Sequence, residues 1–269
     1  MPHKDSEPGY WDKAAQKTAE VQEFDSLLAE QYRSVHLNLI NRWADVANSS
    51  RILKTDLFAE AVHPHRSFLW DLLKANNQVI GIDISAEVTA QAKSKALQYA
   101  PGSSAQYINC DVRHLPFSDN SFDLIISDST LDHFHHSEEI VTALSELSRV
   151  IQPGGTLIIT MDNKSNITEI SFRLWLALGL HPFFIGKTYS QKELNQALAK
   201  VGLQVIANTA IIHNPRFFAR GTISLLRRIS PDRFNEFIRR GLAYLDSFEQ
   251  KRIKYLTAQF IAAKAVKPR

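Results

Sequence analysis

Two acidic residues, Asp111 and Asp128, each stand directly after a short apolar run that is typical of a buried strand. The runs are 107–110 and 122–127, and the segment between them, 115–121, is rich in residues that favour turns. Open α/β sheets bind ligands outside the carboxyl ends of their parallel strands. Because both carboxylates would lie on that rim, the spacing predicts a polar ligand site there.

A third carboxylate, Asp83, lies near the end of another apolar run, 79–84. A carboxylate at the end of the second strand of a βαβ unit can accept hydrogen bonds from both hydroxyls of a ribose. It could instead cap a helix that begins at Ser85. A nicotinamide cofactor would use the same acid, but the chain lacks the Gly-x-Gly-x-x-Gly pattern after the first expected strand, 51–55.

Three motifs follow one another along the chain: Leu115-Pro116-Phe117 after an acid, a strand that opens with Phe122-Asp123, and Pro153-Gly154-Gly155 before the next strand. In these motifs and their order the chain resembles the class I S-adenosylmethionine-dependent methyltransferases, in particular the subgroup that acts on small molecules and quinones. The similarity covers roughly residues 50–165. It implies S-adenosylmethionine as cofactor and methyl transfer to a small, partly apolar acceptor.

The resemblance also implies which residues contact the cofactor. Asp83 would bind the ribose, and Asp111 with Val112 would meet the adenine edge. In the first loop, Asp56 or Glu60 could pair with the ammonium of the methionine portion, while Asp56 could equally cap the following helix. The full set of expected cofactor contacts is Thr55, Asp56, Leu57, Phe58, Glu60, Asp83, Ile84, Asp111, Val112 and Asp128.

The first loop departs from the family pattern because the chain has no glycine between Gly9 and Gly81. Related enzymes place glycines there, where a Cβ would obstruct close approach and disfavour a positive φ. Either this loop takes another path or cofactor affinity is reduced. The departure motivates a second hypothesis, a non-catalytic S-adenosylmethionine-binding or scaffold protein with a methyltransferase fold.

His133 is the candidate catalytic residue, since it follows the fourth expected strand on the same rim and could accept a proton from a hydroxyl or amine acceptor. A hydrogen-bonded structural role is the alternative. The neighbouring His135 and His136 do not form a metal-binding pattern with any recurring carboxylate spacing, so we expect no metal. The single cysteine, Cys110, is interpreted as a packing residue.

The resemblance implies an α/β fold, which we expect to be a Rossmann-like, seven-stranded, mostly parallel sheet with a C-terminal antiparallel hairpin and flanking helices. Helical spacing over 10–47 predicts an N-terminal helical cap, residues 1–48. The methyltransferase domain would span 49–269, with helical insertions at about 165–189 and 215–254. A capping box at Ser190 and Glu193 predicts a helix through Lys200.

Composition bounds the remaining possibilities. The chain has 269 residues, a net charge of +3 and an N-terminus without an apolar segment, so we expect a cytoplasmic protein without a nucleic-acid partner. Residues 216–254 hold ten Lys or Arg against four Asp or Glu, a local balance of +6. This segment is interpreted either as a solvated helical hairpin or as a contact for a membrane surface or an acidic partner.

Overall fold

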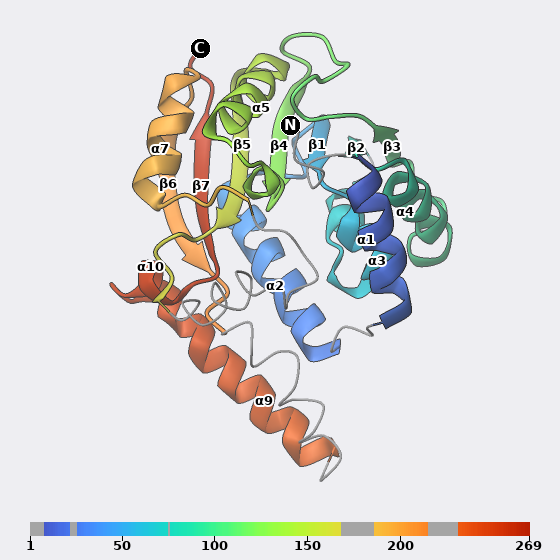
Figure 1. Ribbon diagram of the computed structural model, residues 1–269, viewed down its shortest axis with the longest axis vertical. Helices are drawn as coiled ribbons and strands as arrows, with labels where there is room; N and C mark the ends of the chain where they lie inside the picture. The colour runs from blue at the N-terminus through green and yellow to red at the C-terminus, as the bar shows by residue number, and fades with distance from the viewer. Residues whose placement is uncertain (1–7, 22–25, 75, 168–185, 215–230) are drawn as a thin grey trace.

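The computed structural model describes residues 8–21, 26–74, 76–167, 186–214 and 231–269. Its centre is a seven-stranded sheet with the strand order β3-β2-β1-β4-β5-β7-β6 (Figure 1). In chain order the strands are β1 Arg51–Thr55, β2 Gln78–Asp83, β3 Gln106–Asn109, β4 Phe122–Asp128, β5 Ile151–Asp162, β6 Gln204–Ile211 and β7 Phe260–Val266. The predicted fold class is confirmed.

The direction in which the chain adds strands to the sheet changes between β1 and β4. Strands β1 to β5 pair in parallel, whereas β7 runs antiparallel to both β5 and β6, as expected of the terminal hairpin. The chain adds β2 and β3 on one side of β1 and then crosses to add β4 and β5 on the other. Such a switch point opens a crevice at the carboxyl ends of the strands, and β1 and β4 form its two walls.

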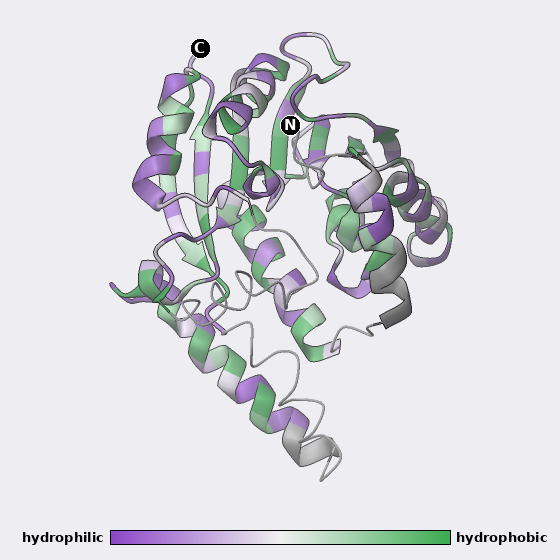
Figure 2. Ribbon diagram, viewed as in Figure 1, coloured by the Kyte–Doolittle hydropathy of each residue, from purple (hydrophilic) through white to green (hydrophobic). Residues whose placement is uncertain are grey.

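Helices cover both faces of the sheet, because successive residues of a strand point to opposite sides. In β4, Ile125 packs in a cluster with α5 and α7, while Leu124 and Ile126 pack in a second cluster with α2 and α4. Figure 2 shows hydrophobic residues concentrated along the central strands between these two layers. The helices are α1 Pro8–Val21, α2 Ser26–Trp43, α3 Phe58–Val62, α4 Ala86–Tyr99, α5 Ser137–Val150, α7 Gln191–Lys200, α9 Pro231–Asp246 and α10 Lys254–Thr257.

Most expected elements appear, with differences at their ends. The helix predicted over 10–47 is divided into α1 and α2. The capping box is confirmed, since Ser190 is the N-cap of α7 and the Glu193 carboxylate accepts the Ser190 backbone N–H at 2.7 Å. Between α3 and β2 the chain forms a short 3-10 turn, Leu69–Leu72.

The proposed domain division stays a prediction. Ala15 of α1 and Tyr32 and Ile40 of α2 belong to the same apolar cluster as the strands, so these helices are packed onto the sheet. The expected insertion at 165–189 lies mostly outside the described residues. In the expected insertion at 215–254, the described residues include α9, which extends away from the sheet (Figure 1).

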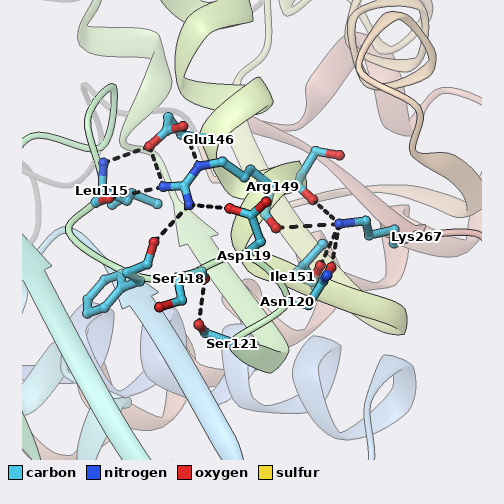
Figure 3. Close-up of polar contacts among 11 residues, drawn as sticks. Leu115, Ser118, Asp119, Asn120, Ser121, Glu146, Arg149, Ile151 and Lys267 are labelled. Atoms are coloured by element: carbon cyan, nitrogen blue, oxygen red, sulfur yellow. Dashed lines mark hydrogen bonds and ion pairs between the residues drawn. The ribbon is translucent and has the colours of Figure 1, made fainter.

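Arg149, in the last turn of α5, holds the Leu-Pro-Phe loop in place (Figure 3). Its guanidinium donates to the backbone carbonyls of Leu115 at 3.0 Å and Phe117 at 2.8 Å, and to the carboxylates of Asp119 and Glu146. The loop before β4 therefore depends on the helix that follows β4.

We expect Arg149→Met to lower the free energy of unfolding by about 1–3 kcal/mol, because two partly buried carbonyls lose a charged donor. Urea unfolding measures the change. Arg240→Met is the matched control, since Arg240 pairs only with Glu236 on an exposed helix face among the contacts described, and its loss should stay within about 0.5 kcal/mol. Equal losses for the two variants would contradict this role.

Candidate functional site

A cavity opens at the switch point, above the carboxyl ends of β1, β2 and β4, and together with the solvent at its mouth it measures about 610 Å³. Thr55 comes from the end of β1, Asp83 from the end of β2, and Thr130 from the segment after β4. The residues that line it are Trp11, Thr55, Asp56, Phe58, Ile82, Asp83, Ile84, Val88, Cys110, Asp111, Val112, Thr130, His133 and Phe134. Eight of the residues predicted for the site are therefore brought together in one place.

The first loop reaches the cavity without glycine because Asp56 adopts the left-handed conformation, with φ of +69°. Its own side chain supports the turn: Oδ1 of Asp56 accepts the backbone N–H of Phe58 at 2.8 Å. Short polar side chains are the ones that tolerate this conformation, since they can bond locally. The capping alternative is wrong in its position, because the N-cap of α3 is Leu57 and no side chain caps it. Asp56 instead supports the turn before the helix, and it lines the cavity as well.

Asp83 joins the first loop to the second strand. Its Oδ2 accepts the backbone N–H of Leu57 at 2.9 Å, and its Oδ1 accepts the N–H of Ser85 at 2.9 Å. Ser85, and not Asp83, is the N-cap of α4, because its hydroxyl accepts the N–H of Val88 at 3.0 Å. Asp83 is therefore not needed to cap that helix, and it is one of the residues that line the cavity.

The buried carboxylates of Asp56 and Asp83 have too few favourable partners to offset the loss of solvation of their charges. Burial, reinforced by the charge of Asp56, raises the pKa of Asp83 to about 7. Burial likewise raises the pKa of Asp56 to about 6, against the opposing effect of Lys54. Two neighbouring carboxylates whose ionised forms are disfavoured make the cavity suited to a ligand that brings positive charge or hydroxyl donors.

Asp111 also lines the cavity, and an ion pair with Arg113 holds it there. The Arg113 Nη2 lies 2.6 Å from Oδ2 of Asp111, and its Nη1 lies 2.6 Å from Glu139 of α5. Val112 is buried beside it, and Ile84 also lines the cavity. Asp111 therefore meets any ligand as part of an ion pair, which sequence spacing alone did not indicate.

His133 ends a 3-10 turn, Leu131–His133, and lines the cavity. The ring of Trp11 packs edge-on against it with centroids 4.5 Å apart, and against Phe58 at 6.3 Å. Trp11 belongs to α1, which is also tied to Ser85 through Asp12 at 2.5 Å. Trp11 was missed by the sequence reasoning, although a covering role of the N-terminal helices was the available signal.

Three predicted cofactor contacts do not line the cavity: Leu57, Glu60 and Asp128. Leu57 and Glu60 are fully buried behind the loop. Asp128 accepts hydrogen bonds from the Tyr32 hydroxyl at 2.9 Å and the Thr160 hydroxyl at 2.6 Å, and it lies 2.9 Å from Nε2 of His36. Although burial alone would raise the pKa of Asp128, His36 and the other partners hold it well below its ordinary value. Asp128 thus fastens α2 to the sheet.

Three further observations bear on the expectations from the sequence. Burial raises the pKa of the Cys110 thiol to about 12, which suits a lining residue that is not a nucleophile. Among the described residues, no three His, Cys, Asp or Glu side chains lie close enough to hold a metal ion. None of the described helices is long and apolar enough to cross a membrane.

The segment that contains Asp83, Asp111 and His133 is similar to known proteins. Residues 66–159 match the family model described as a methyltransferase domain. A curated relative, the probable tRNA methyltransferase 9B of Bos taurus, is 36% identical over 89 residues, which are 32% of this chain and 18% of the relative. The chain thus aligns with less than a fifth of that relative's length.

Solved structures share the fold over most of the chain. The complex between the Haloferax volcanii Trm112 methyltransferase activator and a putative methyltransferase matches with a TM-score of 0.59 and 16% identity, covering 96% of this chain and 98% of that one. A phosphoethanolamine N-methyltransferase of Haemonchus contortus, solved with S-adenosyl-L-methionine, matches with a TM-score of 0.57 and 17% identity, covering 95% and 60%.

These findings correct the predicted partners. A free small molecule was expected, nucleic acid was excluded, and a membrane or acidic partner was considered for 216–254. Relatives named as tRNA methyltransferases contradict the exclusion of nucleic acid, and one solved neighbour is a complex with the Trm112 methyltransferase activator. Sequence reasoning failed here because methyl transfer needs only one nucleophilic atom at the cavity, so the site residues do not reveal what carries that atom.

Proposed function

This chain carries a class I S-adenosylmethionine-dependent methyltransferase domain, and from that premise we propose that its cavity binds S-adenosylmethionine and that the protein transfers the cofactor's methyl group to an acceptor. The observation that carries the proposal is the placement of Asp56, Asp83 and Asp111 around one cavity at the switch point of the sheet. The cofactor combines an ammonium, a sulfonium and ribose hydroxyls, which are the groups that such carboxylates attract.

Each acid has a proposed role. Asp83 accepts the ribose hydroxyls, for which its oxygens keep acceptor capacity beside the N–H groups of Leu57 and Ser85. Asp56 pairs with the ammonium, and Asp111 with Val112 meets the adenine edge. Thr55, Phe58 and Ile84 supply the remaining walls of the cavity.

When bound, S-adenosylmethionine supplies a methyl group on sulfur that an acceptor lone pair can displace in line. The protein's task is then to position the acceptor and, for a hydroxyl or amine, to remove a proton. We propose that His133 accepts this proton. Trp11, Phe58 and Phe134 present aromatic surface at the same cavity, which favours an accepting group that is itself partly apolar, whatever molecule carries it.

Calorimetry with S-adenosylmethionine and S-adenosylhomocysteine is the first test of this function. Binding of both, followed by transfer of a labelled methyl group to one member of an acceptor panel, is the expected result. Total tRNA leads the panel because it is the substrate class in the names of several relatives. Binding without transfer to any acceptor would favour a non-catalytic S-adenosylmethionine-binding protein, and no binding of either ligand would favour a scaffold protein. The glycine-free loop motivates both alternatives. Location in the cytoplasm stays a prediction for cell fractionation to test.

We expect S-adenosylmethionine to bind more weakly as the pH falls from 8 to 5.5. The ligand prefers ionised Asp83 and Asp56, and because their pKa values are raised to about 7 and about 6, both carboxylates take up protons within this range. Binding must then release protons. Calorimetry at pH 6.5 in two buffers with different ionisation enthalpies measures this release, and a proton count of zero would contradict the proposed contacts.

Asp56→Asn tests the ammonium contact separately from the fold of the loop. Asparagine tolerates the left-handed conformation and its Oδ1 can still accept the Phe58 N–H, so only the charge is removed. We expect about a tenfold or greater loss of affinity for S-adenosylmethionine and S-adenosylhomocysteine, because a hydrogen bond to a charged group is lost. Methylthioadenosine, which has no amino acid portion, should bind nearly unchanged. Equal losses for all three ligands would mean that the variant damages the loop.

A further inference from the structure

The loop between β1 and α3 contains a feature that its proposed cofactor contacts do not explain. A residue with a side chain, Asp56, holds a positive φ where backbone would otherwise favour glycine. Directly behind it lies a buried pair of opposite charges, Lys54 and Glu60, neither of which lines the cavity. Burying two charges is unfavourable unless their geometry and remaining hydrogen bonds compensate, so this pair requires a reason.

Lys54 is 1% exposed, and its ammonium reaches the strained residue directly. Nζ donates to the backbone carbonyl of Asp56 at 2.5 Å and lies 3.1 Å from Oε2 of Glu60. It also lies 5.0 Å from the centre of the Phe68 ring. A lysine two residues before the turn therefore holds the carbonyl of the left-handed residue in one direction.

Glu60 completes the arrangement from the other side of the turn. It is fully buried in α3, and its second oxygen, Oε1, accepts the hydroxyl of Ser67 at 2.9 Å. The ammonium of Lys54 is thus fixed between the Glu60 carboxylate and the Asp56 carbonyl. The pair connects the last residues of β1 to the first turn of α3 across the loop.

The loop itself has no glycine, but Gly81 in the neighbouring strand β2 leaves room for the side chain of Leu57. A Cβ added to Gly81 of β2 would lie 2.5 Å from Cδ2 of Leu57 and 2.8 Å from Cδ1 of Leu69. Leu57 consequently packs against bare backbone of β2, and its N–H points to Asp83 at 2.9 Å. The loop is therefore held by side chains at Lys54, Leu57 and Glu60.

We infer that Lys54 and Glu60 are a positioning pair that holds the left-handed turn at Asp56, and through it the Leu57 N–H and the two cavity carboxylates, in the place of a glycine-rich loop. This inference rests on the proposed function for its effect on cofactor affinity, but the conformation of the loop can be measured without any ligand. The pair acts through the loop and does not touch the ligand.

The test removes both charges together, in Lys54→Met/Glu60→Gln, so that no unpaired charge is left in the interior. We expect the Leu57 amide to exchange with solvent at least tenfold faster in the ligand-free protein, and the Kd for S-adenosylmethionine to rise about tenfold, the range expected when a positioning interaction is lost. Lys267→Met is the matched control. Lys267 binds the carbonyls of Ser148 and Ile151 at the opposite end of the sheet, so its loss should lower the Tm and leave both readouts unchanged.

A second background separates positioning from general support of the fold. In Asp56→Gly the positive φ is no longer unfavourable, so removing the pair there should change Leu57 exchange and the Kd less than about twofold. Equal effects in the two backgrounds would overturn the inference. If the double variant does not fold, Ser67→Ala, which removes one bond to Glu60, provides the same comparison with a smaller expected effect. A wild-type protein that binds no S-adenosylmethionine but shows the expected exchange pattern would uphold the inference and refute the proposed function.

Discussion

Replacing Asp83 with alanine is expected to weaken S-adenosylmethionine binding by about 100-fold or more. Two ribose hydroxyls would lose a charged acceptor, and each such bond is worth roughly 1.5–3 kcal/mol. The variant also releases the N–H of Leu57, which Asp83 holds at 2.9 Å, so the first loop loses a tie to β2. Both effects act on the same ligand, which is why this substitution should have the largest effect on affinity.

Asp123→Ala is the control for this variant. Asp123 likewise accepts two backbone N–H groups, from Ser50 and Arg51 at 2.7 Å each, but at the opposite end of β1 from the cavity. We expect it to lower the free energy of unfolding without changing the Kd. Isothermal titration of folded Asp83→Ala that gave the wild-type Kd would rule out the ribose assignment. Weakened binding in both variants would show that affinity follows stability alone.

His133→Ala is expected to lower kcat by about 100- to 10,000-fold for a hydroxyl or amine acceptor, the usual contribution of a positioned general base. The Kd for S-adenosylmethionine should change little, because we assign the cofactor contacts to other residues. The measurement is single-turnover methyl transfer with the acceptor that the panel identifies, followed across pH. The loss of a general base should also flatten the profile of the rate against pH in the variant.

The alternative for His133 is packing, since Trp11 of α1 lies against its ring at 4.5 Å. His133→Phe distinguishes the two roles, because phenylalanine retains an aromatic ring for Trp11 but cannot accept a proton. Recovery of kcat in His133→Phe would assign the residue to packing. His114→Ala, at an exposed position outside the cavity, should leave the rate unchanged.

Local patterns in the sequence were sufficient to predict the sheet and one rim of it. Apolar runs bounded by turn residues located β1 to β4 to within one residue at each end, because buried strands must be apolar and their ends must meet water or a ligand. Asp83 and Asp111 were predicted for the same reason, because polar side chains that end buried strands lie at the edge of the sheet where the strands end. The capping box at Ser190 also succeeded, since it depends on residues three apart.

Only the tertiary structure decided how the first loop works and which acids share the cavity. The sequence showed that the loop lacks glycine, but the compensation lies in contacts across the chain: Lys54 against Glu60, and Leu57 against Gly81 of another strand. Asp128 ends β4 as Asp83 ends β2, yet Tyr32 and His36 of α2 occupy it. Spacing along a strand determines which end a side chain lies at, whereas the partner it meets there depends on how distant helices pack, and that is set by the shape of the whole core.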